Sequence, residues 1–158
     1  RDDSPLHHEI KLLGVGHGRI AQAPLAQEFK RLFTGGPFTM PRKGVDAHED
    51  TKKFFVNYFK QIALVFNGAW NGRKYSVRSA TALRAFIRVA PDVIRRLDQE
   101  HAERSDFRAI GRVIAPWGRR IGDLRFETDG QWKRGATTVE SLTKELKLAL
   151  QYPEGAAV

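Results

Sequence analysis

The sequence contains no cysteine among its 158 residues. A disulfide-stapled scaffold, a cysteine-ligated zinc site, an iron–sulfur cluster and thiol catalysis are therefore excluded. No stretch approaches the roughly 18 consecutive apolar residues of a transmembrane helix, and no apolar run follows the first residues as it would in a signal peptide. These absences are typical of a cytoplasmic protein without a membrane partner, and we predict that location.

The chain begins at Arg1, and its single methionine is Met40. We therefore expect it to be the C-terminal part of a longer protein. Its length of 158 residues suits one domain and is short for two. Hydrophobic residues make up 41% and charged residues 28% of the sequence, a balance that favours a folded core over a disordered chain. We expect residues 1–158 to form a single domain.

The charge of the chain is strongly positive. Lysine and arginine number 27 against 18 acidic residues, which gives a net charge of +9. Residues 71–134 hold 15 of these basic residues, and 13 of the 15 are arginine. Arginine carries a permanent planar charge that suits phosphate and carboxylate groups, so this segment predicts a surface that faces a polyanion such as DNA. The alternatives are a basic surface that serves solubility, or one that faces an acidic domain.

Apolar residues recur at three- and four-residue intervals in several segments, which predicts a mainly α (α+β) fold: a compact helical domain with a small N-terminal β-hairpin. The hairpin is expected at residues 8–22, around a glycine turn. Helices are expected over residues 24–33, 51–67, 79–90, 91–97, 105–115 and 137–150.

Local signals predict where these helices begin and end. Ser79 and Ser105 are suitable N-caps, and residues 137–140 read as the start of a capping box. Pro91 is expected to break one helix and begin another, because proline has no N–H to donate. Pro116, followed by Trp and Gly, is expected to end the helix that Ser105 begins.

No catalytic or metal-binding motif is convincing. The glycines of residues 14–18 lack the spacing of a phosphate-binding loop, and His7, His8 and His17 have no acidic partner at ligand spacing. The acidic residues and histidine of residues 46–50 are interpreted as a helix start that the macrodipole favours, although metal-dependent hydrolysis uses similar groups. We predict no cofactor, no metal and no catalytic residue, and we expect this chain not to be an enzyme.

Basic residues and tryptophan alternate in two turn-rich segments, residues 70–75 and 131–134. Exposed aromatic rings among cations can stack on bases while the cations bind phosphate, although Trp70 also suits a place in the core. The paired arginines later in the chain either grip phosphates or form salt bridges with acidic residues such as Asp92, Glu100 and Asp123. The predicted phosphate contacts are Arg73, Lys74, Arg78, Arg84, Arg88, Arg119, Arg120, Lys133 and Arg134.

Several short motifs follow one another in residues 4–95. They are, in order, Ile10-Lys11-Leu12, Ile20-Ala21-Gln22, Val56–Ile62, Phe66–Trp70, Thr81–Phe86 and Ala90-Pro91-Asp92. Their order resembles the C-terminal half of DGQHR-domain proteins, a group that includes the DndB-type regulators of DNA phosphorothioate modification. The resemblance implies a role in bacterial DNA modification, its transcriptional regulation or an associated antiviral defence system.

The motif that names this family lies in the N-terminal half of its members, which this chain does not contain. Residues 129–134, Asp-Gly-Gln-Trp-Lys-Arg, are similar to it, but they follow the matched segment and carry Trp132 where the motif has histidine. We interpret them as a coincidental turn, so the family's functional residues are not carried over. We predict a DNA-binding or DNA-associated module. The alternative is a structural domain that packs on a missing N-terminal catalytic half.

Overall fold

The structure is a computed structural model that describes residues 22–32, 35–39, 47–68, 80–122 and 138–151. These residues form five α-helices and one short 3-10 helix, with no strand among them. The elements are α2 (Gln22–Leu32), η1 (Pro37–Thr39), α3 (Ala47–Val65), α5 (Ala80–Gln99), α6 (Phe107–Arg120) and α7 (Val139–Gln151). The predicted mainly helical fold is confirmed. The predicted β-hairpin lies outside the described residues, except Gln22, which begins α2 instead of ending a strand.

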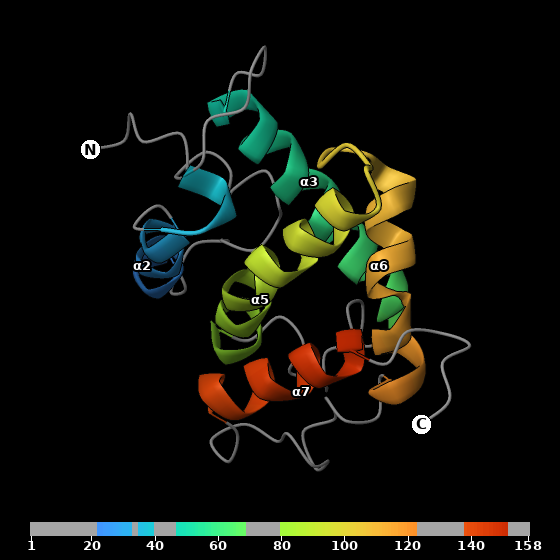
Figure 1. Cartoon of the computed structure of the whole chain (residues 1–158). Coiled ribbons are helices and arrows are strands. Elements are labelled where there is room, and N and C mark those ends of the chain that lie inside the picture. The colour runs from blue at the N-terminus through green and yellow to red at the C-terminus, as the bar shows by residue number, and fades with distance from the viewer. Residues whose placement is uncertain (1–21, 33–34, 40–46, 69–79, 123–137, 152–158) are drawn as a thin grey trace.

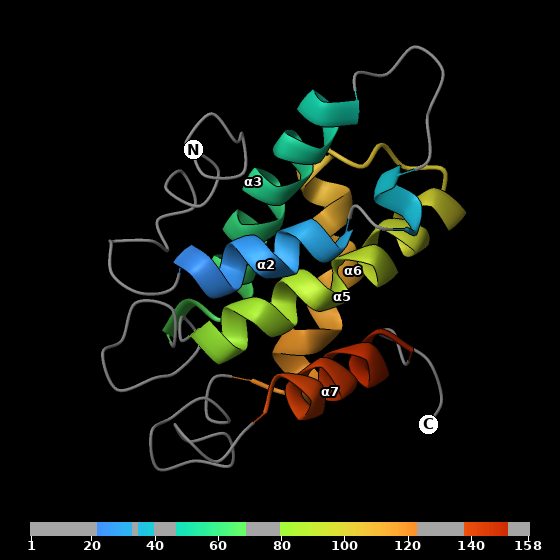
Figure 2. The ribbon, with the colours of Figure 1, turned by 90° about the vertical axis from the view of Figure 1, so that its left-hand side faces the viewer.

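Helix α5 lies at the centre of the domain and packs against α2, α6, α7 and η1. Figure 1 shows it crossing the middle of the molecule, and Figure 2 shows α2 running beside it. Its apolar residues recur at helical spacing and lie in the core; Phe86, Ala90, Val93 and Ile94 are fully buried. A helix that is covered on several sides in this way derives its stability mainly from packing.

Large aromatic side chains of α3 fill the space between that helix and the rest of the core. Tyr58 is fully buried, its ring packs near Trp117, and its hydroxyl donates a 2.6 Å hydrogen bond to the carbonyl of Phe86. Burial raises the pKa of the Tyr58 phenol well above its ordinary value, with the charge of Asp92 adding to the effect. Trp117 donates its indole N–H to the carbonyl of Leu146 at 3.0 Å. Both buried polar groups are therefore satisfied.

Two prolines lie inside helices and do not end them, contrary to expectation. Helix α5 continues through Pro91, because apolar residues on both sides of it, such as Phe86 and Val93, are buried in the same core. This packing outweighs the ~3 kcal/mol that an interior proline costs. Helix α6 likewise continues through Pro116 and ends at Arg120. Trp117, the residue after this proline, is fully buried in the core. Among the helices described, none has the length and apolar character that a bilayer crossing needs.

Helices α6 and α7 begin with the kinds of cap that the sequence predicts, an N-cap and a capping box, but at other residues. Helix α6 is capped by Asp106, not Ser105: its carboxylate accepts the N–H of Ala109 at 3.1 Å. Before α7, the hydroxyl of Thr138 accepts the N–H of Ser141, and the Ser141 hydroxyl accepts the N–H of Thr138 in return. This reciprocal pair is a capping box in which serine takes the usual place of Glu or Gln.

Replacing Asp106 with alanine is expected to lower the free energy of unfolding by about 1 kcal/mol, because the orphan N–H of Ala109 loses its acceptor. The matched control is Ser105→Ala. Ser105 contributes only its backbone carbonyl, which accepts the side-chain amide of Asn57, so this change should have almost no effect. Urea denaturation of both variants measures the difference. A larger loss from Ser105→Ala would contradict the assignment of the cap.

Candidate nucleic-acid interface

The structure describes four of the nine predicted phosphate contacts. Arg84 and Arg88 lie on α5, and Arg119 and Arg120 lie in the last turn of α6. The other five predicted contacts lie outside the described residues; they are Arg73, Lys74, Arg78, Lys133 and Arg134. The α5 and α6 pairs therefore belong to different helices, and they have different surroundings.

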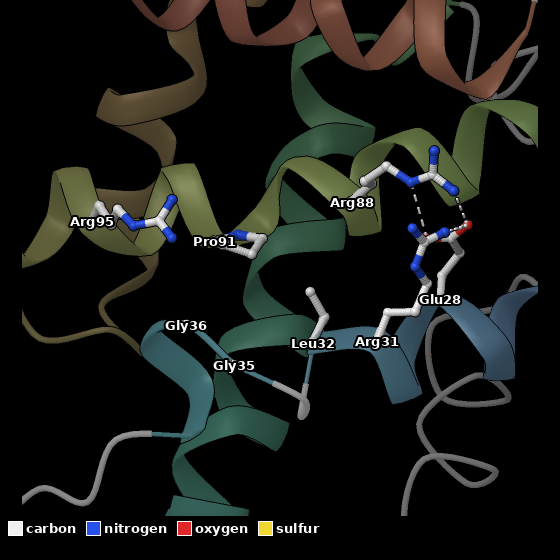
Figure 3. Close-up of a pocket in the computed structure, with 8 residues that line it drawn as sticks. All are labelled: Glu28, Arg31, Leu32, Gly35, Gly36, Arg88, Pro91 and Arg95. Carbon is white, nitrogen blue, oxygen red and sulfur yellow. Dashed lines mark hydrogen bonds and ion pairs between the residues drawn. The ribbon is translucent and has the colours of Figure 1, made fainter.

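The α5 pair is bound to a carboxylate within the protein. Glu28 of α2 is 2% exposed and forms ion pairs with both arginines. Its Oε2 lies 2.6 Å from the Nη2 of Arg88 and 3.1 Å from the Nη2 of Arg84. Arg31 reaches the same carboxylate at 3.9 Å. Figure 3 shows Arg88 and Glu28 facing one another across the gap between the two helices. These arginines form a salt bridge, as one of the sequence-based alternatives allowed, but with Glu28 instead of the acidic residues suggested there.

The ionisation of Glu28 follows from these contacts. Burial raises the pKa of the carboxyl, but the hydrogen bonds and charges of Arg88 and Arg84 outweigh it and hold the pKa below the ordinary value. The reverse effect acts on Arg88, whose pKa is raised by its hydrogen bond to Glu28. The pair is therefore charged at neutral pH, and it connects α2 to α5.

The stability of the domain should consequently fall in acid. Because the folded-state pKa of Glu28 lies below its ordinary value of 4.5, this group contributes stability that is present above about pH 4.5 and lost as the pH falls through the folded pKa. Urea denaturation from pH 7 to pH 3 measures the effect. Glu28→Gln should remove this part of the pH dependence, whereas Glu140→Gln should leave it, because Glu140 contacts Arg88 but is 79% exposed. Identical profiles for wild type and Glu28→Gln would contradict the assignment.

Helix α6 presents the other arginine surface. Its sequence contains four arginines and no acidic residue, and apart from Phe107 every exposed residue of the helix is an arginine. At 3.6 residues per turn, Arg108, Arg112 and Arg119 lie within about 40° of one another around the helix axis, while Arg120 points about 100° away from Arg119. We call Arg108, Arg112 and Arg119 the α6 stripe. It is about 16 Å long, the rise over eleven residues.

Helix α3 holds the α6 stripe in place. The side-chain amide of Gln61 donates to the carbonyl of Phe107 at 2.9 Å. Gly111 lies directly against this amide: a Cβ on Gly111 would be 2.7 Å from the Gln61 nitrogen. A second glycine, Gly118, lies against Val65. The face of α6 that carries Gly111 and Gly118 therefore packs closely on α3, and the stripe lies on a helix that is packed into the domain.

The contact of Arg112 with Glu100 leaves this arginine accessible. Arg112 is 65% exposed and lies 3.9 Å from Glu100, which is itself 41% exposed. A surface pair at this distance contributes about 0–1 kcal/mol, so a phosphate group can replace it at little cost. Arg108 and Arg119 are also exposed.

Two groups of the interface were not recognised from the sequence, although signals for both are present. Arg108 and Arg112 follow the helical spacing opposite Ile110, Val113 and Ile114, so a helical wheel of this segment would have placed them outside. Glu28 precedes the buried Phe29 by one residue and lies one turn before Leu32, and a carboxylate on an apolar face indicates a buried partner.

The acidic cluster before α3 has a structural explanation. Glu49 and Asp50 lie in the first turn of the helix, where negative charge is stabilised by the helix dipole. Within the described part of the chain, no three side chains of histidine or acidic residues gather as metal ligands would. Comparisons with protein-family models, with curated proteins and with solved structures find no match to this chain, and the resemblance to DGQHR-domain proteins stays a prediction.

Proposed function

We propose that this chain is a DNA-binding module that holds the phosphate backbone through the α6 stripe. The observation that carries the proposal is the composition of the exposed face of α6, where Arg108, Arg112 and Arg119 line up without an acidic residue in the helix. Along the axis of a duplex, each strand carries one phosphate about every 3.4 Å. A row of arginines about 16 Å long can therefore contact several of them.

The proposed binding is not sequence-specific at this helix. Bases are distinguished mainly by bidentate arginine, asparagine and glutamine side chains within the grooves, whereas phosphate contacts position a protein without reading sequence. The small residue Ala115, between Arg112 and Arg119 in the helix, offers no hydrogen-bonding side chain. Any preference for phosphorothioated DNA, as the family resemblance suggests, would have to come from other residues.

Fluorescence anisotropy of the chain with a labelled duplex tests the proposal. We expect binding at about 50 mM salt that weakens strongly by about 200 mM. The same titration with a phosphorothioated duplex tests the proposed connection to DNA modification, which predicts tighter binding. Absence of binding to either duplex at low salt would contradict the proposal.

Absence of DNA binding would favour the other predicted role, a structural domain that packs on an N-terminal half. That role requires a large exposed apolar patch. The described residues expose three large hydrophobic side chains, Leu64, Phe107 and Leu148, which lie on three different helices. Single exposed side chains of this kind are normal for a protein surface, so we favour DNA binding.

A further inference from the structure

An open pocket of about 330 Å³ lies between α2, α5 and the two glycines before η1, Gly35 and Gly36. Figure 3 shows Glu28 and Arg88 at one end of it and Arg95 at the other, with Pro91 between them. The pocket is on the α2 side of the domain, whereas α6 lies on the other side of α5 in Figure 1. It is therefore a separate surface from the α6 stripe.

The lining of this pocket has an excess of positive charge. Three arginines, Arg31, Arg88 and Arg95, line it together with a single carboxylate, that of Glu28. The lining side chains therefore carry a net of two positive charges. A phosphate group, with a charge of about −1.5 to −2 at neutral pH, matches that excess.

The three arginines differ in how firmly they are held. Arg88 is 22% exposed and its guanidinium is fixed by the 2.6 Å contact with Glu28. Arg31 and Arg95 are 63% and 55% exposed, and Arg95 lies 3.4 Å from Asp92. An exposed pair of this length is weak, so Arg95 can turn toward an anion while Arg88 provides a fixed positive charge.

The remaining lining provides room and an apolar surface. Gly36 has a φ of +90°, a conformation that other residues rarely adopt, and the Arg95 guanidinium lies 3.8 Å from the position that a Cβ there would take. Gly35 faces open space. With no side chain at either glycine, the pocket stays open on this side. Leu32 and Pro91 add apolar surface beside the arginines.

We propose that this pocket binds the phosphate group of a small ligand, either inorganic phosphate or a phosphate monoester, through Arg31, Arg88 and Arg95. Arginine forks match the oxygens of phosphate in geometry and charge. The proposal is independent of the proposed DNA binding, because it uses different residues on a different face.

Isothermal titration with sodium phosphate and with phenyl phosphate, each at matched ionic strength, tests the proposal. Both ligands should bind the wild-type chain, and the double variant Arg31→Gln/Arg95→Gln should lose affinity about tenfold or more. The control is Lys30→Gln, which removes one exposed charge from the same helix outside the pocket and should leave the affinity unchanged. Thermal denaturation of each variant verifies that it is folded. The single variants Arg31→Gln and Arg95→Gln are titrated in the same way.

The outcomes separate as follows. Tighter binding of phenyl phosphate would identify a phosphate monoester as the ligand class, since Leu32 and Pro91 would contact its apolar part. Equal or tighter binding of inorganic phosphate would identify the free ion. Malonate binding as tightly as phosphate would overturn the assignment to phosphate. Absence of binding to wild type, or equal affinity in the double variant, would overturn the site itself.

Discussion

Replacing Glu28 with alanine is expected to lower the free energy of unfolding by about 2–3 kcal/mol. The substitution leaves Arg84 and Arg88 facing each other without the buried carboxylate that now accepts both. Breaking a buried ion pair by removing one partner costs about 3–5 kcal/mol. The expected loss here is smaller, because Arg84 and Arg88 are 36% and 22% exposed and water relieves part of the repulsion. Urea denaturation at pH 7 measures it.

The matched comparison is the removal of an exposed carboxylate that contacts the same arginine. Glu140→Ala should change the free energy of unfolding by less than about 0.5 kcal/mol, since Glu140 is 79% exposed and 3.6 Å from Arg88. An equal effect of the two substitutions would show that burial of Glu28 has no special role. Glu28→Gln should fall between wild type and Glu28→Ala, because the amide oxygen still accepts a hydrogen bond.

These contacts also determine which arginines can be used to test DNA binding. Reversing the charge of Arg84 and Arg88 would place two carboxylates beside Glu28, which is 2% exposed, and would destabilise the fold. Lost affinity in such a variant would therefore not identify a phosphate contact. The α6 stripe does not have this difficulty, because its residues are exposed.

Substituting all three residues of the α6 stripe with glutamine is expected to weaken DNA binding about 500-fold at roughly 0.1 M salt. Each phosphate contact contributes about 0.9 to the slope of log affinity against log salt, so three contacts account for about 2.7 powers of ten between 0.1 M and 1 M. The loss should be similar for unrelated duplex sequences, because phosphate contacts carry no sequence information. Anisotropy titrations with several duplexes measure it.

A control with the same loss of charge separates local contacts from the net charge of the chain. Lys30, Lys144 and Lys147 are exposed on α2 and α7, and their joint substitution with glutamine also removes three positive charges. Affinity should then fall by a much smaller factor. Equal losses of DNA affinity in the two triple variants would show that the affinity depends on the overall charge and not on contacts of α6.

Much of the fold follows from the spacing of apolar residues. Phe55 and Ile62 of α3, and Leu83 and Phe86 of α5, follow this helical spacing and are buried. The apolar pattern repeats regularly over a long segment in each case, so it indicates a helix without ambiguity. Helix ends were less predictable. Pro91 and Pro116 were expected to interrupt helices, but a local rule about proline does not include the burial of Val93 and Trp117 beyond them.

The candidate interface was predictable only in part, because charge in a sequence does not reveal which partner it meets. Arg84 and Arg88 have the same one-turn spacing as Arg108 and Arg112. The first pair contacts Glu28, which is 56 residues away from Arg84 in the chain, and the second remains on the surface. Only the packing of α2 on α5 brings Glu28 to the first pair. The residues around Glu28 indicate that it has a buried partner, but not which residue that partner is.

The salt dependence of DNA binding by wild type and by the α6 triple variant tests the central claim most directly. If Arg108, Arg112 and Arg119 each neutralise a phosphate, the slope of log affinity against log salt should be less steep in the variant by about 2.7. The lysine control should keep a slope close to that of wild type. Equal slopes for wild type and the α6 variant would contradict the claim that this helix holds the DNA backbone.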